Sequence, residues 1–192
     1  AVVRTHGGRA DQAVLFTAWP TTDFFADTRG ARANRLLAEV LGLRLTDELR
    51  EKQGATYSPS ADATQSLILP GWGYISTVVE VPPDRIGSVT EDIRRITADL
   101  AREPPAADEI ARARKPALEG VLQGRATNGY WLSALSGVQA DPRQLDALRS
   151  LVPTLEGLTA ADVQSAARKW LLDGRMWRLE VVPEPKAARS AP

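Results

Sequence analysis

The chain has 192 residues, of which 43% are hydrophobic, and this is enough for one substantial core. Its 24 basic and 24 acidic side chains cancel, so the sequence predicts neither a nucleic-acid-binding face nor a surface for anionic membranes. The absence of cysteine excludes disulfides and thiolate metal sites, and no apolar segment is long enough to span a bilayer.

The two ends of the chain have a distinct character. No signal peptide opens it, and the start AVVRTHGG is untypical of a natural N-terminus, so we expect a piece of a longer polypeptide. Residues 183–192 are rich in Pro and Ala, which predicts a disordered tail after a single domain over residues 1–182. The excess of Arg over Lys suggests a bacterial source, and the compartment is left open between periplasm and cytoplasm.

The first elements predicted are a strand and a long helix. Residues 12–19 (QAVLFTAW) form a short apolar run that ends at Pro20, which predicts a buried strand. A helix is expected over residues 29–52, with Gly42 as a potential break.

A hairpin and a second helix follow. Residues 55–63 predict a strand, and the alternation over residues 73–81 predicts a second strand that pairs with it. Pro82 and Pro83 then begin a helix whose apolar residues recur at intervals of three and four. This stripe consists of Ile86, Val89, Ile93, Ile96 and Leu100.

Further helices are expected up to residue 172, and a final strand over residues 175–182. The first of these helices begins near Asp108, and Pro116 should kink it because proline removes a backbone donor. Thr159 to Asp162 has the pattern of a capping box. The order of elements predicts an α+β fold: a mostly antiparallel mixed sheet, helices packed on one face, and a helical block before the last strand.

The segment Leu43–Ser58 carries the main candidate site. Arg50 lies in the last turn of the predicted helix, Gly54 has the position of a left-handed C-terminal residue, and Tyr57 opens the predicted strand. If their polar ends converge, the guanidinium and the phenol would donate hydrogen bonds to a carbonyl or an oxyanion. The alternative is structural, because an arginine suits the helix dipole and a tyrosine ring packs.

The sequence offers few residues for other kinds of catalytic site. His6 is the single histidine, so a zinc site with its usual ligands is not expected, and neither is a serine protease triad. Asn128, Tyr130 and Trp131 cluster at helical spacing, and we interpret the aromatic pair as core-facing.

The helix end and turn resemble a signature in the C-terminal half-domains of the insulinase/pitrilysin family of zinc metallopeptidases, which includes mitochondrial processing peptidase-like proteins. There a helix ends in Leu-Arg-Glu, and Gly-x-x-Tyr-Ser leads into a strand. The Asn128–Trp131 segment also looks like bacterial members, although no role is assigned to Asn128 or Trp131. The matching residues of the signature are Leu49, Arg50, Glu51, Gly54, Tyr57 and Ser58.

The resemblance implies a division of labour between two similarly folded halves. An N-terminal half-domain, in the same or a partner chain, holds zinc. The metal-free half closes over the peptide and presents Arg50 and Tyr57 to the substrate backbone or the oxyanion. This fragment would therefore bind no cofactor and be inactive alone, with a homo-oligomer left open. The alternative is a non-catalytic scaffold or assembly domain of the same fold.

Overall fold

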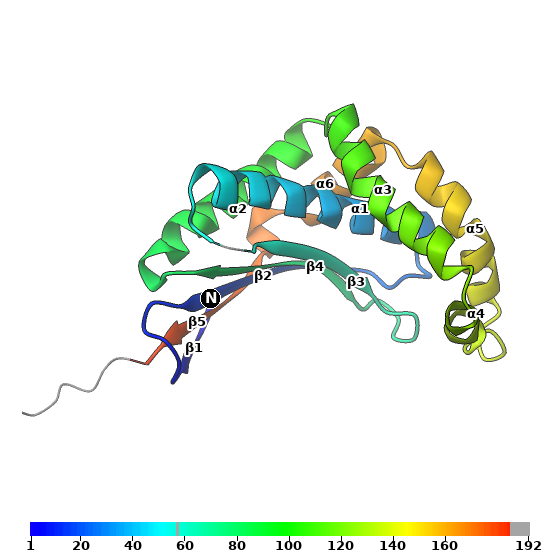
Figure 1. Ribbon diagram of the computed structural model, residues 1–192, viewed down its shortest axis with the longest axis horizontal. Coiled ribbons are helices and arrows are strands. Elements are labelled where there is room, and N and C mark those ends of the chain that lie inside the picture. Colours follow the sequence, from blue (N-terminus) through cyan, green and yellow to red (C-terminus); the bar gives the residue numbers. More distant parts are fainter. Residues whose placement is uncertain (57, 185–192) are drawn as a thin grey trace, which may run out of the picture.

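The computed structural model describes residues 1–56 and 58–184, which form one five-stranded mixed sheet with the helices on one face (Figure 1). The strands lie in the order β1-β5-β2-β4-β3, and only the β1–β5 pair is parallel. The predicted α+β fold and mostly antiparallel sheet are confirmed. The strands are β1 (Val2–His6), β2 (Ala13–Thr21), β3 (Ser60–Gln65), β4 (Gly73–Val81) and β5 (Trp177–Pro183).

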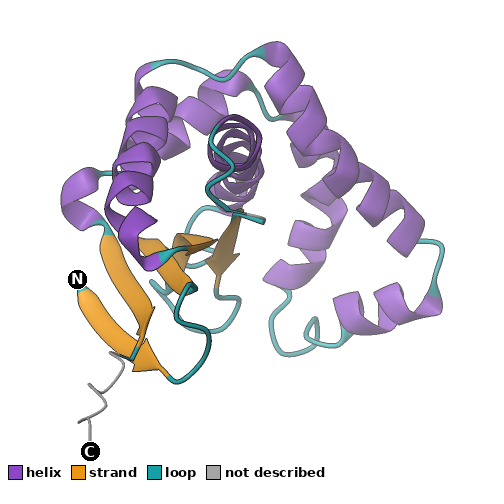
Figure 2. Ribbon diagram, turned by 60° about the vertical axis from the view of Figure 1, so that its left-hand side comes forward, coloured by secondary structure: helices purple, strands orange, loops and turns teal. Residues whose placement is uncertain are grey.

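The helices form two groups, all on the same side of the sheet (Figure 2). Helices α1, α2 and α6 cover the sheet, whereas α3, α4 and α5 form a helical arm, residues 107–157, that extends beyond its edge (Figure 1). The α-helices are α1 (Thr28–Leu45), α2 (Ile86–Arg102), α3 (Ala107–Gly124), α4 (Asn128–Leu135), α5 (Arg143–Gly157) and α6 (Ala160–Trp170). Shorter turns are the π-helical η1 (Thr46–Lys52) and the 3-10 turns η2 (Pro83–Arg85) and η3 (Asp173–Arg175).

The core lies between the sheet and its covering helices. The helix-facing side of β4, including Ile75 and Val79, is fully buried, as is Ile93 at the centre of the α2 stripe. The stripe packs inward as its periodicity predicts. Between β2 and β4 the hydroxyls of Thr17 and Thr77 lie 2.7 Å apart, so each of these two buried hydroxyls is the partner of the other.

The first two strands differ from the expectation. β1 was not predicted; it is short and pairs with β5 at the opposite end of the sequence. β2 does not end at Pro20 but continues to Thr21. The β5 partner reaches only Ala18, so Pro20 has a neighbouring strand on one side alone, where a missing N–H is tolerated.

Strand boundaries also differ near residues 55 and 183. The strand expected from Ala55 begins at Ser60, directly after Pro59, which cannot donate to a ladder. The last strand begins at Trp177, after the η3 turn. Pro183 belongs to this strand rather than to a frayed tail, and the N–H of Glu184 donates to the carbonyl of His6 at 3.0 Å. The rest of the predicted tail, residues 185–192, lies outside the described residues.

Neither Gly42 nor Pro116 ends its helix, and the kink expected at Pro116 stays a prediction. α1 passes through Gly42 and continues into η1 without a break, and α3 continues through Pro116. Other helix signals act as predicted. Thr159 and Asp162 exchange capping-box hydrogen bonds at the start of α6.

Candidate functional site

The candidate site begins where the long α1–η1 helix ends. Leu45 and Leu49 are fully buried and anchor the last turns to the core. Gly54 has a φ of 58°, the left-handed conformation expected of a residue that stops a helix. Its N–H donates to the carbonyl of Arg50 at 3.1 Å, and the N–H of Ala55 donates to the carbonyl of Leu49 at 2.7 Å. The predicted helix end is therefore confirmed, and these two backbone hydrogen bonds cap the last turn.

The final turn is π-helical, with a wider hydrogen-bonded ring than an α-helix. π-Helical turns are rare in proteins, and those that occur are often found at functional sites. Here the π-helical turn contains Arg50. The side chain of Arg50 is 52% exposed, and its Nε donates to Glu51 Oε1 at 2.9 Å. An exposed pair between neighbouring residues contributes little to stability, so Arg50 presents a cation at the surface.

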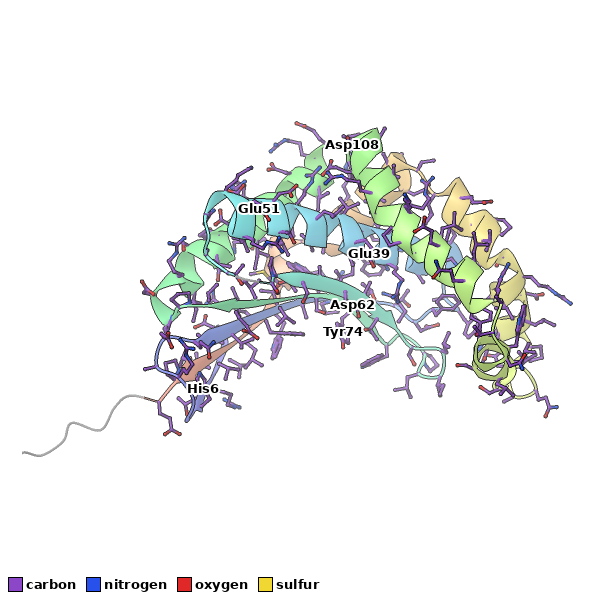
Figure 3. The ribbon with its side chains drawn as sticks, in the orientation of Figure 1. His6, Glu39, Glu51, Asp62, Tyr74 and Asp108 are labelled. Carbon is purple, nitrogen blue, oxygen red and sulfur yellow. The ribbon has the colours of Figure 1, made fainter. Side chains whose placement is uncertain are left out.

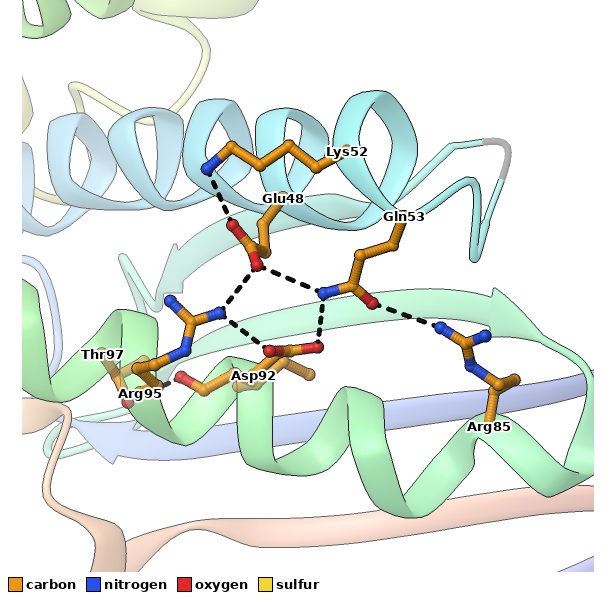
Figure 4. A network of polar contacts seen from close by, with 8 residues as sticks. Glu48, Lys52, Gln53, Arg85, Asp92, Arg95 and Thr97 are labelled. Carbon is orange, nitrogen blue, oxygen red and sulfur yellow. Dashed lines mark hydrogen bonds and ion pairs between the residues drawn. The ribbon is translucent and has the colours of Figure 1, made fainter.

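A polar network fixes this turn to α2 (Figure 4). Glu48 of η1 accepts from Lys52 at 3.0 Å, from Gln53 at 3.2 Å and from Arg95 of α2 at 3.0 Å. The hydrogen bonds from Lys52 and Gln53 lower the pKa of Glu48, with a smaller contribution from the charges of Lys52 and Arg95. Glu48 is thereby held as a carboxylate at neutral pH.

Gln53 extends the same network on the far side of the turn. Its amide nitrogen donates to Asp92 of α2 at 3.0 Å, and its amide oxygen accepts from Arg85 at 3.3 Å. Asp92 also accepts from Arg95 at 2.8 Å. The residue that precedes Gly54 is thus bonded to two elements, which restricts the movement of the helix end that carries Arg50.

The partner proposed for Arg50 is Tyr57, which lies outside the described residues. The described segment stops at Thr56, and β3 begins three residues after Tyr57. Convergence of Arg50 and Tyr57 therefore stays a prediction.

The histidine does not belong to a metal site. The Nδ1 atom of His6 accepts from the N–H of Gly8 at 3.0 Å, and Nε2 lies 2.9 Å from the carbonyl of Gln12, so a neutral ring protonated on Nε2 satisfies both contacts. Across residues 1–56 and 58–184 there is no group of three His, Asp or Glu side chains that could hold a metal. The residues in the described part of the chain do not fit a zinc ion.

Residues 1–116 match the family model of the Peptidase M16 inactive domain, which is more than half of the chain. The chain belongs to this family. The resemblance of the chain to metal-free half-domains of zinc metallopeptidases is thereby confirmed at the level of the family.

Two known M16 proteins are similar to this chain. The chloroplastic stromal processing peptidase of Arabidopsis thaliana is 29% identical over 155 residues, which are 78% of this chain and 12% of that protein. The solved M16 inactive domain from Pseudomonas fluorescens has a TM-score of 0.78 and 21% identity, and the match covers 98% of this chain and 45% of that chain. The present chain thus spans less than half of each of these proteins.

A third relative has about the same extent as the present chain. An inactive peptidase domain from Bordetella parapertussis has a TM-score of 0.78 and 16% identity, over 95% of this chain and 99% of that one. None of the described helices of the present M16 domain is long and apolar enough to cross a membrane.

The aromatic cluster of this M16 domain lies on the helical arm. Trp131 does not face the core: it is 40% exposed, and its indole N–H donates to the carbonyl of Arg125 at 2.8 Å. Tyr130 is half-buried and contacts Trp131 edge-on, with ring centroids 5.3 Å apart. Asn128 is exposed at the start of α4. The interpretation of a core-facing pair is wrong for Trp131, because the arm extends past the sheet.

Proposed function

We propose that this M16 inactive domain is the substrate-binding half of a zinc-dependent endopeptidase, in which Arg50 and Tyr57 donate hydrogen bonds to the peptide. The observation that carries the proposal is the surface cation at a fixed helix end. Within the described residues, Nη1 and Nη2 of Arg50 have no protein partner. A fixed helix end supports this proposal, because stabilisation of a developing charge requires donors that are pre-positioned.

The chemistry assigned to this half is electrostatic. Hydrolysis of a peptide bond places negative charge on the carbonyl oxygen, and donors at that position stabilise the transition state more than the ground state. A guanidinium offers a planar set of N–H groups, and a phenol offers one O–H. Zinc is held by the N-terminal half-domain of the same chain or of a partner chain.

Kinetics of two variants in the parent peptidase would test the proposal. Tyr57→Phe removes one hydroxyl and almost no volume, and we expect kcat to fall by about 10²–10³ with a smaller change in KM. Arg50→Lys keeps the charge but loses the planar donor set, and it should be impaired as well.

The control for Arg50→Lys is Arg112→Lys, because Arg112 is an exposed arginine on α3 whose pair with Asp108 is long, at 3.6 Å. Melting temperatures of all variants would verify that the fold is retained. Near-wild-type kcat/KM for both Tyr57→Phe and Arg50→Lys would contradict the shared site, and the scaffold or assembly role would then account for the chain.

A further inference from the structure

A deep groove separates the sheet from the helical arm. It has a volume of about 860 Å³ and lies between α1, β3 and helices α3 to α5. Its walls are largely apolar, and Leu67 of the β3–β4 loop is on its rim with 47% of its surface exposed. Apolar lining residues include Phe24, Phe25, Leu36, Leu148 and Leu151.

One wall of the groove is an unpaired strand edge. β3 is the last strand of the sheet, and its residues 62–65 line the groove. The N–H of Ser66 donates to the carbonyl of Trp72 at 2.9 Å, one step beyond the Gln65–Gly73 pair, and antiparallel ladders alternate between bonded and non-bonded pairs. The backbone N–H and C=O groups of Ala61, Ala63 and Gln65 therefore point away from β4. No described strand pairs with this edge.

The groove carries basic side chains that form no ion pair with an acidic residue of the described segments. Arg32 of α1 is only 5% exposed, and it donates to Thr154 Oγ1 at 2.7 Å and to the hydroxyl and carbonyl of Ser150 at 3.1 and 3.0 Å. Its Nε has no partner, and no carboxylate pairs with it in the described parts of the chain. Burial lowers the pKa of Arg32, as expected for a cation without a counter-charge.

Two further arginines and two carboxylates complete the set of charged lining residues. Arg35 is exposed one turn along α1, and Arg114 of α3 donates to the carbonyl of Leu158. The carboxylates are Glu39 on α1 and Asp62 on β3 (Figure 3).

These charges are separated along the groove. Gly42 of α1 lies against Ala61, whereas Gln65 shares a small cavity with Ala31 and Asn34 of α1. The end of β3 near Gln65 is therefore beside Arg32 and Arg35, and the other end is beside Glu39.

We propose that this groove binds an extended, acidic peptide segment of a partner protein, which adds a strand to the β3 edge and places acidic side chains beside Arg35. Main-chain hydrogen bonds to Ala63 and Gln65 supply affinity, and the arginines supply the preference for acidic residues. The site lies on different residues from Arg50 and Tyr57 and involves no metal. A negative result for peptide binding in this groove would therefore leave the proposal for Arg50 and Tyr57 untouched, and the reverse also holds.

Fluorescence anisotropy with labelled decapeptides would test the site on the purified 192-residue chain. The probe alternates Val and Glu. One control peptide replaces Glu by Lys, and the other carries N-methyl groups on every backbone amide, so that neither of its edges can donate to a strand. We expect saturable binding of the Val–Glu peptide, weaker binding at higher salt, and at least tenfold weaker binding of both controls. Equal binding of the N-methylated peptide would overturn strand addition, and equal binding of the Lys peptide would overturn the acidic preference.

Charge reversal on the protein locates the site. Arg35→Glu should weaken binding of the Val–Glu peptide about tenfold, since Arg35 is exposed and its replacement leaves the core unchanged. Arg4→Glu is the matched control, because Arg4 is an exposed arginine on β1, the opposite edge of the sheet. No saturable binding up to about 1 mM peptide, or a larger effect of Arg4→Glu than of Arg35→Glu, would overturn the proposal.

Discussion

The sheet with α1, α2 and α6 differs from the helical arm in what holds it together. Buried side chains dominate the first region, where α1 and α2 each contribute more core residues than any other element. In the arm, α3 buries only Ile110 and Ala113, α5 buries Leu155, and α4 buries none of its residues. The difference indicates that apolar burial sets the stability of the molecule, while the arm is positioned mainly by polar contacts.

Arginine side chains make many of these polar contacts. Arg32 of α1 bonds to backbone and hydroxyl oxygens of α5, and Arg125 donates to the carbonyl of Leu148 at 3.3 Å. The bidentate pair between Arg44 of α1 and Glu109 of α3, at 2.8 and 3.0 Å, joins the base of the arm to the sheet-covering layer. Because the contacts of Arg32 and Arg44 join the arm to α1 and not to β3, the groove between β3 and the arm stays open.

The largest effect on stability is expected in the sheet-covering layer. Ile93→Ala should reduce the free energy of unfolding by about 2–5 kcal/mol, because Ile93 is fully buried at the centre of the α2 stripe. Denaturant titration would measure the loss. The same change at Ile68, which is exposed in the β3–β4 loop, is the control and should cost under about 0.5 kcal/mol. A similarly small loss at Ile93 would show that α2 does not carry the core.

An intermediate effect is expected where the arm joins α1. Glu109→Gln should cost about 1 kcal/mol at neutral pH, because it removes the charge from a partly buried bidentate pair. The bond from Arg44 lowers the pKa of Glu109, so the stabilisation is present above the ordinary carboxyl pKa and is lost as the pH falls through the lowered value.

Denaturant titrations of wild type and Glu109→Gln across acidic pH would test this dependence. The difference between the two proteins should shrink as the pH falls. A difference that stays constant with pH would indicate that packing, and not the carboxylate charge, joins the arm to α1.

The smallest effect is expected at the end of the arm. Leu132→Ala should change the free energy of unfolding by under about 0.5 kcal/mol, since Leu132 of α4 is 75% exposed. Leu41→Ala, at a fully buried leucine of α1, is the contrasting control for the same titration. A large loss at Leu132 would mean that the arm contributes a core of its own.

The sequence predicted those structural features that depend only on residues close together in the chain. The stripe from Ile86 to Leu100, the turn at Gly54 and the capping box at Thr159 each depend on neighbouring residues, and all three are confirmed. β1 could not be predicted in this way, because the strand is defined by pairing with β5 at the other end of the chain.

The candidate site was predictable in part. The position of Arg50 at a helix end follows from the sequence, whereas the π-helical turn and the bonds of Gln53 to Asp92 and Arg85 depend on tertiary contacts. The groove gave only a weak signal in the sequence: Arg32 and Arg35 lie one turn apart in the helix, among other charged residues. Its walls come from elements far apart in the chain, so no single stretch indicates them.

The central claim is that this half of an M16 peptidase supplies hydrogen-bond donors and no metal. Zinc analysis of the purified chain after dialysis, combined with a fluorogenic peptide assay, tests it most directly. We expect substoichiometric zinc and no turnover, because His6 is engaged with Gly8 and Gln12 and no ligand cluster exists among the described residues. Stoichiometric zinc, or turnover that a chelator abolishes, would contradict the account.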